Sequence, residues 1–108
     1  MYEEFYDHNA EEFLGGKCEY RATVADLSMA YEVDTYDLAK YGDKWFVLRA
    51  NGCSCWAGEW GVEFSGDSLE AVREYVTGEY GTQLTEYYKD FISEWSEALA
   101  KAEIIHGW

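Results

Sequence analysis

The residues of this chain best suited to chemistry are three cysteines and two histidines. Cys53 and Cys55 are separated by one residue, and Cys18 lies far upstream. With His8 or His106 they could supply the four thiolate and imidazole ligands of a tetrahedral zinc site. Structural zinc sites usually space paired cysteines by two to four residues. A zinc-stabilised interaction module is therefore an alternative prediction, and the main prediction includes no metal and no cofactor.

The sequence offers no pattern typical of an enzyme. Either histidine could activate a cysteine nucleophile, but no glycine-rich helix start follows a cysteine to stabilise an oxyanion. No phosphate loop, dinucleotide fingerprint or metalloprotease helix is found in the 108 residues. Any of the 22 Asp and Glu residues could act as a general acid, and the sequence does not single one out. We therefore predict that the protein is not an enzyme.

Negative charge is the dominant property of the chain. The 22 acidic residues face only 8 Lys and Arg, which gives a formal net charge of −14. Residues 1–16 carry five acids and no base, and residues 51–80 carry six acids and one base. A chain with a large net negative charge and no basic patch is not expected to bind nucleic acid or a membrane directly. It is expected to attract basic surfaces instead.

Two interpretations of this acidity are open. The charge could simply keep the protein soluble, as it does in many acidic proteins. Alternatively, carboxylates on a rigid scaffold could occupy the Lys/Arg groove that a nucleic-acid-binding protein keeps for phosphates. We predict the second, an acidic inhibitor acting as a nucleic-acid mimic or plug, with aromatic side chains adding contact area. The expected partner-binding residues are Glu3, Glu4, Asp7, Glu11, Glu12, Trp56, Glu59, Trp60, Glu63, Asp67, Glu70 and Glu74.

A glycine-rich segment with two tryptophans separates the two halves of the chain. Residues 51–61 read NGCSCWAGEWG, with three glycines, and are not expected to form a regular element. Trp56 and Trp60 could grip a ligand or partner, which makes a small ligand-binding protein a further alternative. The two rings could equally fold back over the edge of a sheet.

The high aromatic content of 19% provides material for a packed core, so we expect one domain over residues 1–108. Amphipathic spacing predicts a helix over 2–14, ended by Gly15 and Gly16. Period-two patterns predict strands near 18–26, 29–38 and 44–50, with a turn at 41–43 and a short returning strand at 62–64.

The second half of the chain has helical periodicity. Asp67 and Glu70 have capping-box spacing, which predicts a helix start there, and Gly78 is expected to end this helix. A second helix is expected from Thr82 to Ile105, over 30 Å long at about 1.5 Å per residue. The predicted fold is α+β: an antiparallel sheet of three or four strands packed against an N-terminal helix and two C-terminal helices, with acidic residues on the outward positions of the sheet.

The expected location is the cytoplasm. No apolar run of about 18 residues is present to form a transmembrane helix. The start of the chain is acidic where a signal peptide would be basic. The cysteine count is odd, whereas secreted disulfide frameworks normally use even numbers.

The small size, the lack of proline, the acidity, the aromatic richness and the Gly52–Trp56 sequence GCSCW resemble small phage-encoded proteins. Some of these are anti-defence factors, including DNA-mimic inhibitors of restriction and CRISPR systems. The resemblance implies a host nucleic-acid-handling complex as the target, in the host cytoplasm. The expected partner is a basic nucleic-acid-binding protein such as a defence nuclease, bound by a monomer or homodimer. Typical mimics are mostly helical, so the predicted sheet departs from part of that class.

Overall fold

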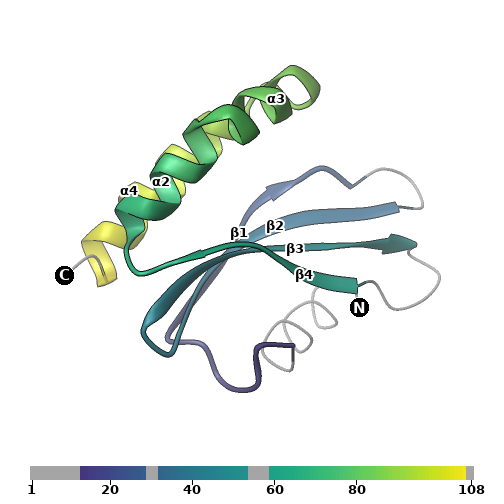
Figure 1. Cartoon of the computed structure of the whole chain (residues 1–108). Helices are drawn as coiled ribbons and strands as arrows, with labels where there is room; N and C mark the ends of the chain where they lie inside the picture. The colour runs from purple at the N-terminus through teal and green to yellow at the C-terminus, as the bar shows by residue number, and fades with distance from the viewer. Residues whose placement is uncertain (1–12, 29–31, 54–58, 107–108) are drawn as a thin grey trace.

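The computed structural model describes residues 13–28, 32–53 and 59–106. Four strands form one antiparallel sheet in the order β1-β2-β3-β4, and three helices follow them (Figure 1). The strands are β1 (Tyr20–Asp26), β2 (Glu32–Tyr41), β3 (Lys44–Cys53) and β4 (Glu59–Gly66), and the helices are α2 (Leu69–Thr77), α3 (Glu79–Tyr87) and α4 (Phe91–His106). The predicted α+β class and antiparallel sheet are confirmed.

A tight turn at Gly42 and Asp43 sets the register of the central hairpin. Gly42 has a φ of 63°, a left-handed conformation that glycine adopts without steric cost. From this turn β2 and β3 pair without interruption from Tyr41 opposite Lys44 to Glu32 opposite Cys53. The predicted strands in this region are therefore confirmed, and both run further than expected.

The expectation of no regular structure over residues 51–61 is wrong at both ends of that segment. Strand β3 continues to Cys53 because Asn51 and Gly52 pair with β2, and β4 already begins at Glu59. Ladder pairing with a central strand outweighs the low strand propensity of the glycines and asparagine in this segment. Residues 54–58 lie outside the described residues.

The central strands are buried on both faces. Along β2, Tyr36 and Leu38 belong to the core beneath the helices, whereas Thr35, Asp37 and Ala39 point to the opposite face, and all five are buried. Successive strand residues alternate between faces, so continuous burial means that both faces are covered. Asp37 therefore lies on the face away from the helices, where an acidic residue was expected, but it is buried there at 1% exposure.

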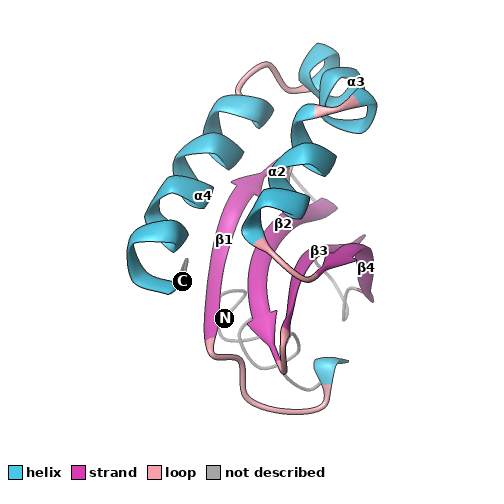
Figure 2. Cartoon of the chain, turned by 60° about the vertical axis from the view of Figure 1, so that its left-hand side comes forward, coloured by secondary structure: helices cyan, strands magenta, loops and turns pink. Residues whose placement is uncertain are grey.

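The helices cover one face of the sheet, with α2 over β3 and β4 and α4 over β1 (Figure 2). Trp95 and Leu99 of α4 are fully buried against the sheet core. From α2, the buried residues Leu69, Val72 and Val76 recur at helical spacing and join the same core. This packing fixes the orientation of α2 and therefore of the side chains on its outer side.

The start of α2 differs from the prediction by one residue. Ser68 is the N-cap, and its hydroxyl accepts a hydrogen bond from the Ala71 N–H at 3.2 Å. Asp67 lies one residue earlier, with its carboxylate 3.1 Å from the Lys44 ammonium group. Serine is as good an N-cap as aspartate, so the choice depends on where β4 ends. The helix ends at Gly78 as predicted.

The single long helix predicted over Thr82–Ile105 is wrong. Tyr88 adopts an extended conformation with a ψ of 98°, which ends α3, and α4 begins at Phe91. The break lets α4 run back alongside α2, whereas a straight helix of this length would leave the sheet (Figure 1). Burial of Phe91 and Trp95 stabilises the reversed path. Three helices, rather than two, therefore follow the sheet.

The N-terminal helix is not confirmed. Of the segment 2–14, residues 2–12 lie outside the described residues, and only Phe13 and Leu14 are seen to be helical. The three helices with assigned bounds all follow the strands. Within the described part of the chain, no helix combines the length and apolarity needed to cross a bilayer.

Candidate functional site

The exposed side of α2 carries a row of carboxylates. Asp67 precedes the N-cap Ser68, and Glu70 and Glu74 follow at intervals of three and four residues, all exposed. This spacing places Glu70 and Glu74 on one side of the helix, opposite the buried apolar side. We call Asp67, Glu70 and Glu74 the acidic face of α2. It contains three of the predicted partner-binding residues.

Nearby cations neutralise the acidic face of α2 only in part. The Lys44 ammonium group reaches Asp67, but both side chains are largely exposed, so water and salt screen this pair. The Arg73 guanidinium turns toward α4 and lies 3.4 Å from a carboxylate oxygen of Glu103. Among the described side chains, no ion pair is formed by Glu70 or Glu74.

Cations elsewhere on the molecule are mostly engaged. Six of the eight Lys and Arg side chains form ion pairs with Asp or Glu, so most of the positive charge is neutralised locally. These six are Arg21, Lys40, Lys44, Arg49, Arg73 and Lys101. The surplus carboxylates therefore dominate the long-range field.

Two predicted contact residues lie away from the acidic face. Glu63 points toward α3, where its carboxylate accepts a hydrogen bond from the Tyr80 hydroxyl at 2.9 Å. Trp60 is paired with Ala50 on the sheet face opposite the helices, and its ring lies 5.9 Å from the Arg21 guanidinium. The predicted set therefore does not form one continuous surface.

Several predictions lie outside the described residues. This applies to every acid of the expected N-terminal helix, to Trp56 and to the side chain of Glu59; the residues concerned are Glu3, Glu4, Asp7, Glu11, Glu12, Trp56 and Glu59. It also applies to His8, to Cys55 and to the side chains of Cys53 and His106, whereas Cys18 is described and half-buried. Among the described residues, no group of three His, Cys, Asp or Glu is placed to hold a metal ion. The zinc alternative stays a prediction.

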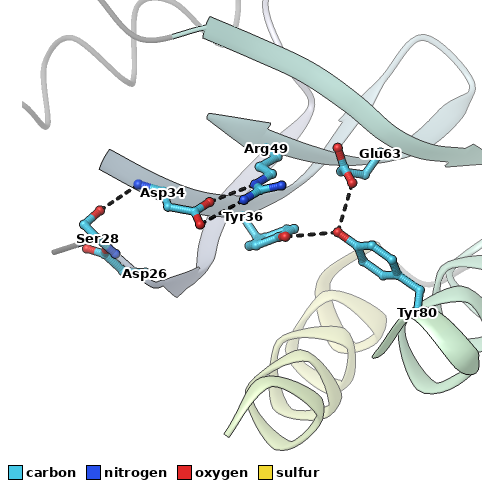
Figure 3. Close-up of polar contacts among 7 residues, drawn as sticks. All are labelled: Asp26, Ser28, Asp34, Tyr36, Arg49, Glu63 and Tyr80. Carbon is cyan, nitrogen blue, oxygen red and sulfur yellow. Dashed lines mark hydrogen bonds and ion pairs between the residues drawn. The ribbon is translucent and has the colours of Figure 1, made fainter. Parts of the chain in front are cut away.

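A polar network that the sequence did not reveal links the sheet to α3 (Figure 3). The Arg49 guanidinium donates two hydrogen bonds to the Asp34 carboxylate, at 2.8 and 3.0 Å, and lies over the Tyr36 ring. The hydroxyls of Tyr36 and Tyr80 are 3.0 Å apart, and Tyr80 donates to Glu63. Asp34 thus faces the helices, contrary to its predicted outward position. Counting the register back from the Gly42 turn would have placed Arg49 opposite Tyr36.

Burial and hydrogen bonding set the protonation states in this network. Burial raises the pKa of Tyr80 well above its usual value, and its hydrogen bonds to Tyr36 and Glu63 raise it further. Burial also raises the pKa of Tyr36. Both hydroxyls therefore stay protonated at neutral pH, so they serve as hydrogen-bond donors rather than as bases or nucleophiles. The arrangement joins α3 to the sheet.

Replacing Tyr80 with phenylalanine should weaken this connection. The Glu63 carboxylate and the Tyr36 hydroxyl would each lose a partner while still half-buried or buried, which we expect to cost about 1–3 kcal/mol of unfolding free energy. Urea denaturation followed by tryptophan fluorescence measures the change. Tyr87→Phe is the matched control on the same helix, because Tyr87 is 70% exposed. Equal effects of the two variants would contradict a structural role for the Tyr80 hydroxyl.

Comparisons with protein-family models, with curated proteins and with solved structures found no match for this chain. The functional argument therefore starts from the acidic face of α2 and the elements that hold it.

Proposed function

We propose that this protein is a non-enzymatic acidic inhibitor that binds the basic nucleic-acid-binding surface of another protein. The observation that carries the proposal is the acidic face of α2. Glu70 and Glu74 project from a helix whose opposite side is anchored in the core by Leu69, Val72 and Val76. The carboxylates are therefore presented on a rigid support, about 6 Å apart along the helix axis.

A rigid row of carboxylates suits a surface that normally binds phosphates. Lys and Arg side chains in a nucleic-acid groove gain affinity by neutralising a row of backbone charges. An acidic protein competes for the same side chains, and its net charge of −14 would accelerate the encounter. In the setting suggested by the phage-like character of the sequence, the target is a defence nuclease in the host cytoplasm, bound by a monomer or homodimer of this chain.

Reversing the charge of Glu70 and Glu74 should weaken binding of the basic partner by at least about tenfold. Each attraction between one of these carboxylates and a Lys or Arg of the partner then becomes a repulsion. The measurement is retention of the partner from host lysate by E70K/E74K and by the unmodified protein, at low and at high salt. The unmodified protein should retain its partner at low salt and release it at high salt.

The matched control is E86K/E97K, which changes the net charge equally at exposed positions of α3 and α4. It should bind nearly as well as the unmodified protein. If both double variants lose binding equally, overall charge rather than the acidic face of α2 drives recognition. If binding is indifferent to salt and to both variants, the acidity serves solubility and the proposal is wrong.

A further inference from the structure

Helices α2 and α4 lie side by side over the sheet and run in opposite directions (Figure 2). An ion pair shows which of their residues are level, because a guanidinium nitrogen of Arg73 lies 3.4 Å from a carboxylate oxygen of Glu103. Glu70 lies three residues before Arg73, and Ile104 lies one residue after Glu103. Both steps lead toward the same end of the helix pair. At about 1.5 Å per residue, Ile104 is therefore level with the stretch of α2 between Glu70 and Glu74.

Both helices turn the residue after this ion pair toward solvent. In α2 the residue before the arginine, Val72, is buried, and the residue after it, Glu74, is exposed. In α4 the residue before the glutamate, Ala102, is buried, and the residue after it, Ile104, is exposed. Successive residues are about 100° apart around a helix, so Glu74 and Ile104 both point away from the sheet. Ile104 is 80% exposed, more than any other large apolar side chain that the structure describes.

We call Glu70, Glu74 and Ile104 the α2–α4 surface. It combines two carboxylates that form no ion pair within the described part of the chain with an exposed apolar side chain on the neighbouring helix. A complementary partner supplies two cations about 6 Å apart and an apolar group level with the space between them. A second copy of this chain would instead bring like charges together, which disfavours self-association through this surface.

A helix supplies this pattern of side chains, whereas an extended segment does not. Residues i and i+4 of a helix lie on one side about 6 Å apart along the axis, and residue i+3 lies between them on the adjoining side. In an extended strand, the residue between two side chains of one face points to the opposite face. Helices also pack onto other helices by fitting ridges of side chains into grooves. A basic helix therefore matches the surface better than a basic strand.

We propose that the α2–α4 surface binds an amphipathic basic helix of the partner. Lysine or arginine at positions i and i+4 of that helix faces Glu70 and Glu74, and an apolar residue at i+3 contacts Ile104. This inference rests on the proposed function, since it names the form of the basic partner. The charged contacts accelerate the encounter, and burial of Ile104 adds affinity that salt does not screen.

A synthetic peptide tests this inference. It has about 15 residues, enough for an alanine-rich sequence to be partly helical, with lysines at i and i+4 and leucines at i+3 and i+7. Fluorescence anisotropy of the labelled peptide at low salt measures its binding to the full chain. Ile104→Ser should weaken binding about tenfold, because burial of an apolar side chain is lost.

Ile105→Ser is the matched control on the same helix. Ile105 is 60% exposed and lies about 200° around the axis of α4 from Glu103, so it points away from α2. This variant should weaken binding of the peptide by less than about twofold. A second peptide, with proline at two central alanine positions, cannot form a continuous helix and should bind at least about tenfold more weakly to the unmodified protein.

Three results would overturn the inference: no binding of the helical peptide, equal binding of the two peptides, or equal effects of Ile104→Ser and Ile105→Ser. The proposed function would still stand in each case if E70K/E74K loses the partner from host lysate. If E70K/E74K keeps that partner and also binds the helical peptide as the unmodified protein does, the proposed function fails together with the inference.

Discussion

Replacing Gly81 with alanine is expected to destabilise the protein by at least about 3 kcal/mol, near the upper end of the range for overpacked sites. Gly81 is buried in the first turn of α3, where the chain passes directly against the end of α2. An added Cβ would overlap the Val76 carbonyl oxygen and lie 2.6 Å from the carbonyl carbon. Both atoms belong to the backbone, so α2 and α3 would have to separate. Tyr80, the adjacent residue, would then be drawn away from Glu63.

Gly61→Ala is the matched control, because it adds the same methyl group where no heavy atom lies within 4 Å. It should be neutral or stabilising, by up to about 1 kcal/mol, since alanine restricts the unfolded chain. Urea denaturation of both variants gives the comparison. A loss below about 1 kcal/mol for Gly81→Ala would mean that the close approach of α2 and α3 is not required for folding.

The strands were predictable because a local signal and the tertiary structure agree. Residues 20–26 and 44–50 carry period-two or β-prone patterns, and these segments form β1 and most of β3. The extension of β3 to Cys53 was not predictable from propensity, because pairing with β2 stabilises Gly52 within the ladder. Such pairing depends on the register, and the register depends on one turn at Gly42.

The break between α3 and α4 shows where helical periodicity misleads. Leu84, Tyr88, Phe91 and Trp95 fit one continuous apolar stripe, so the pattern alone predicts one helix. The break depends on long-range packing of α4 beside α2, which no local window contains. One signal was present: Asp90, a favoured N-cap residue type, precedes Phe91, and its carbonyl accepts the Glu94 N–H at 2.9 Å.

The candidate site was predicted only where a single element carries it. Glu70 and Glu74 share one side of α2 and Asp67 lies just before its N-cap, so the helical spacing was sufficient to place Glu70 and Glu74 together. Glu63 and Trp60 were also predicted to belong to the partner-binding set. Their positions in β4 direct them to opposite faces of the sheet, and the Glu63 carboxylate accepts a hydrogen bond from Tyr80 on the helix face. The sheet face that a strand residue occupies can be assigned only when the pairing register of that strand is known.

Removing the Asp37 carboxylate is expected to have a similarly large effect. An Arg21 guanidinium nitrogen lies 2.9 Å from Asp37, and the two side chains are 16% and 1% exposed. Asp37→Ala would leave the Arg21 charge nearly buried without this counter-ion, a change that costs about 3–5 kcal/mol in comparable pairs. Thermal and urea denaturation measure the loss. The residue lies on the sheet face away from α2, so any remaining folded protein should keep its affinity for the basic partner.

The contrast with an exposed pair isolates the contribution of burial. Glu97 and Lys101 form an ion pair at 3.5 Å on α4 with both side chains about 70% exposed. Glu97→Ala should therefore change stability by no more than about 0.5 kcal/mol. Replacing the buried pair together, as R21M/D37L, should recover much of the stability lost in Asp37→Ala, because both buried charges are then removed. If Asp37→Ala and Glu97→Ala lower the free energy of unfolding equally, burial does not strengthen the contribution of the Arg21–Asp37 ion pair to stability.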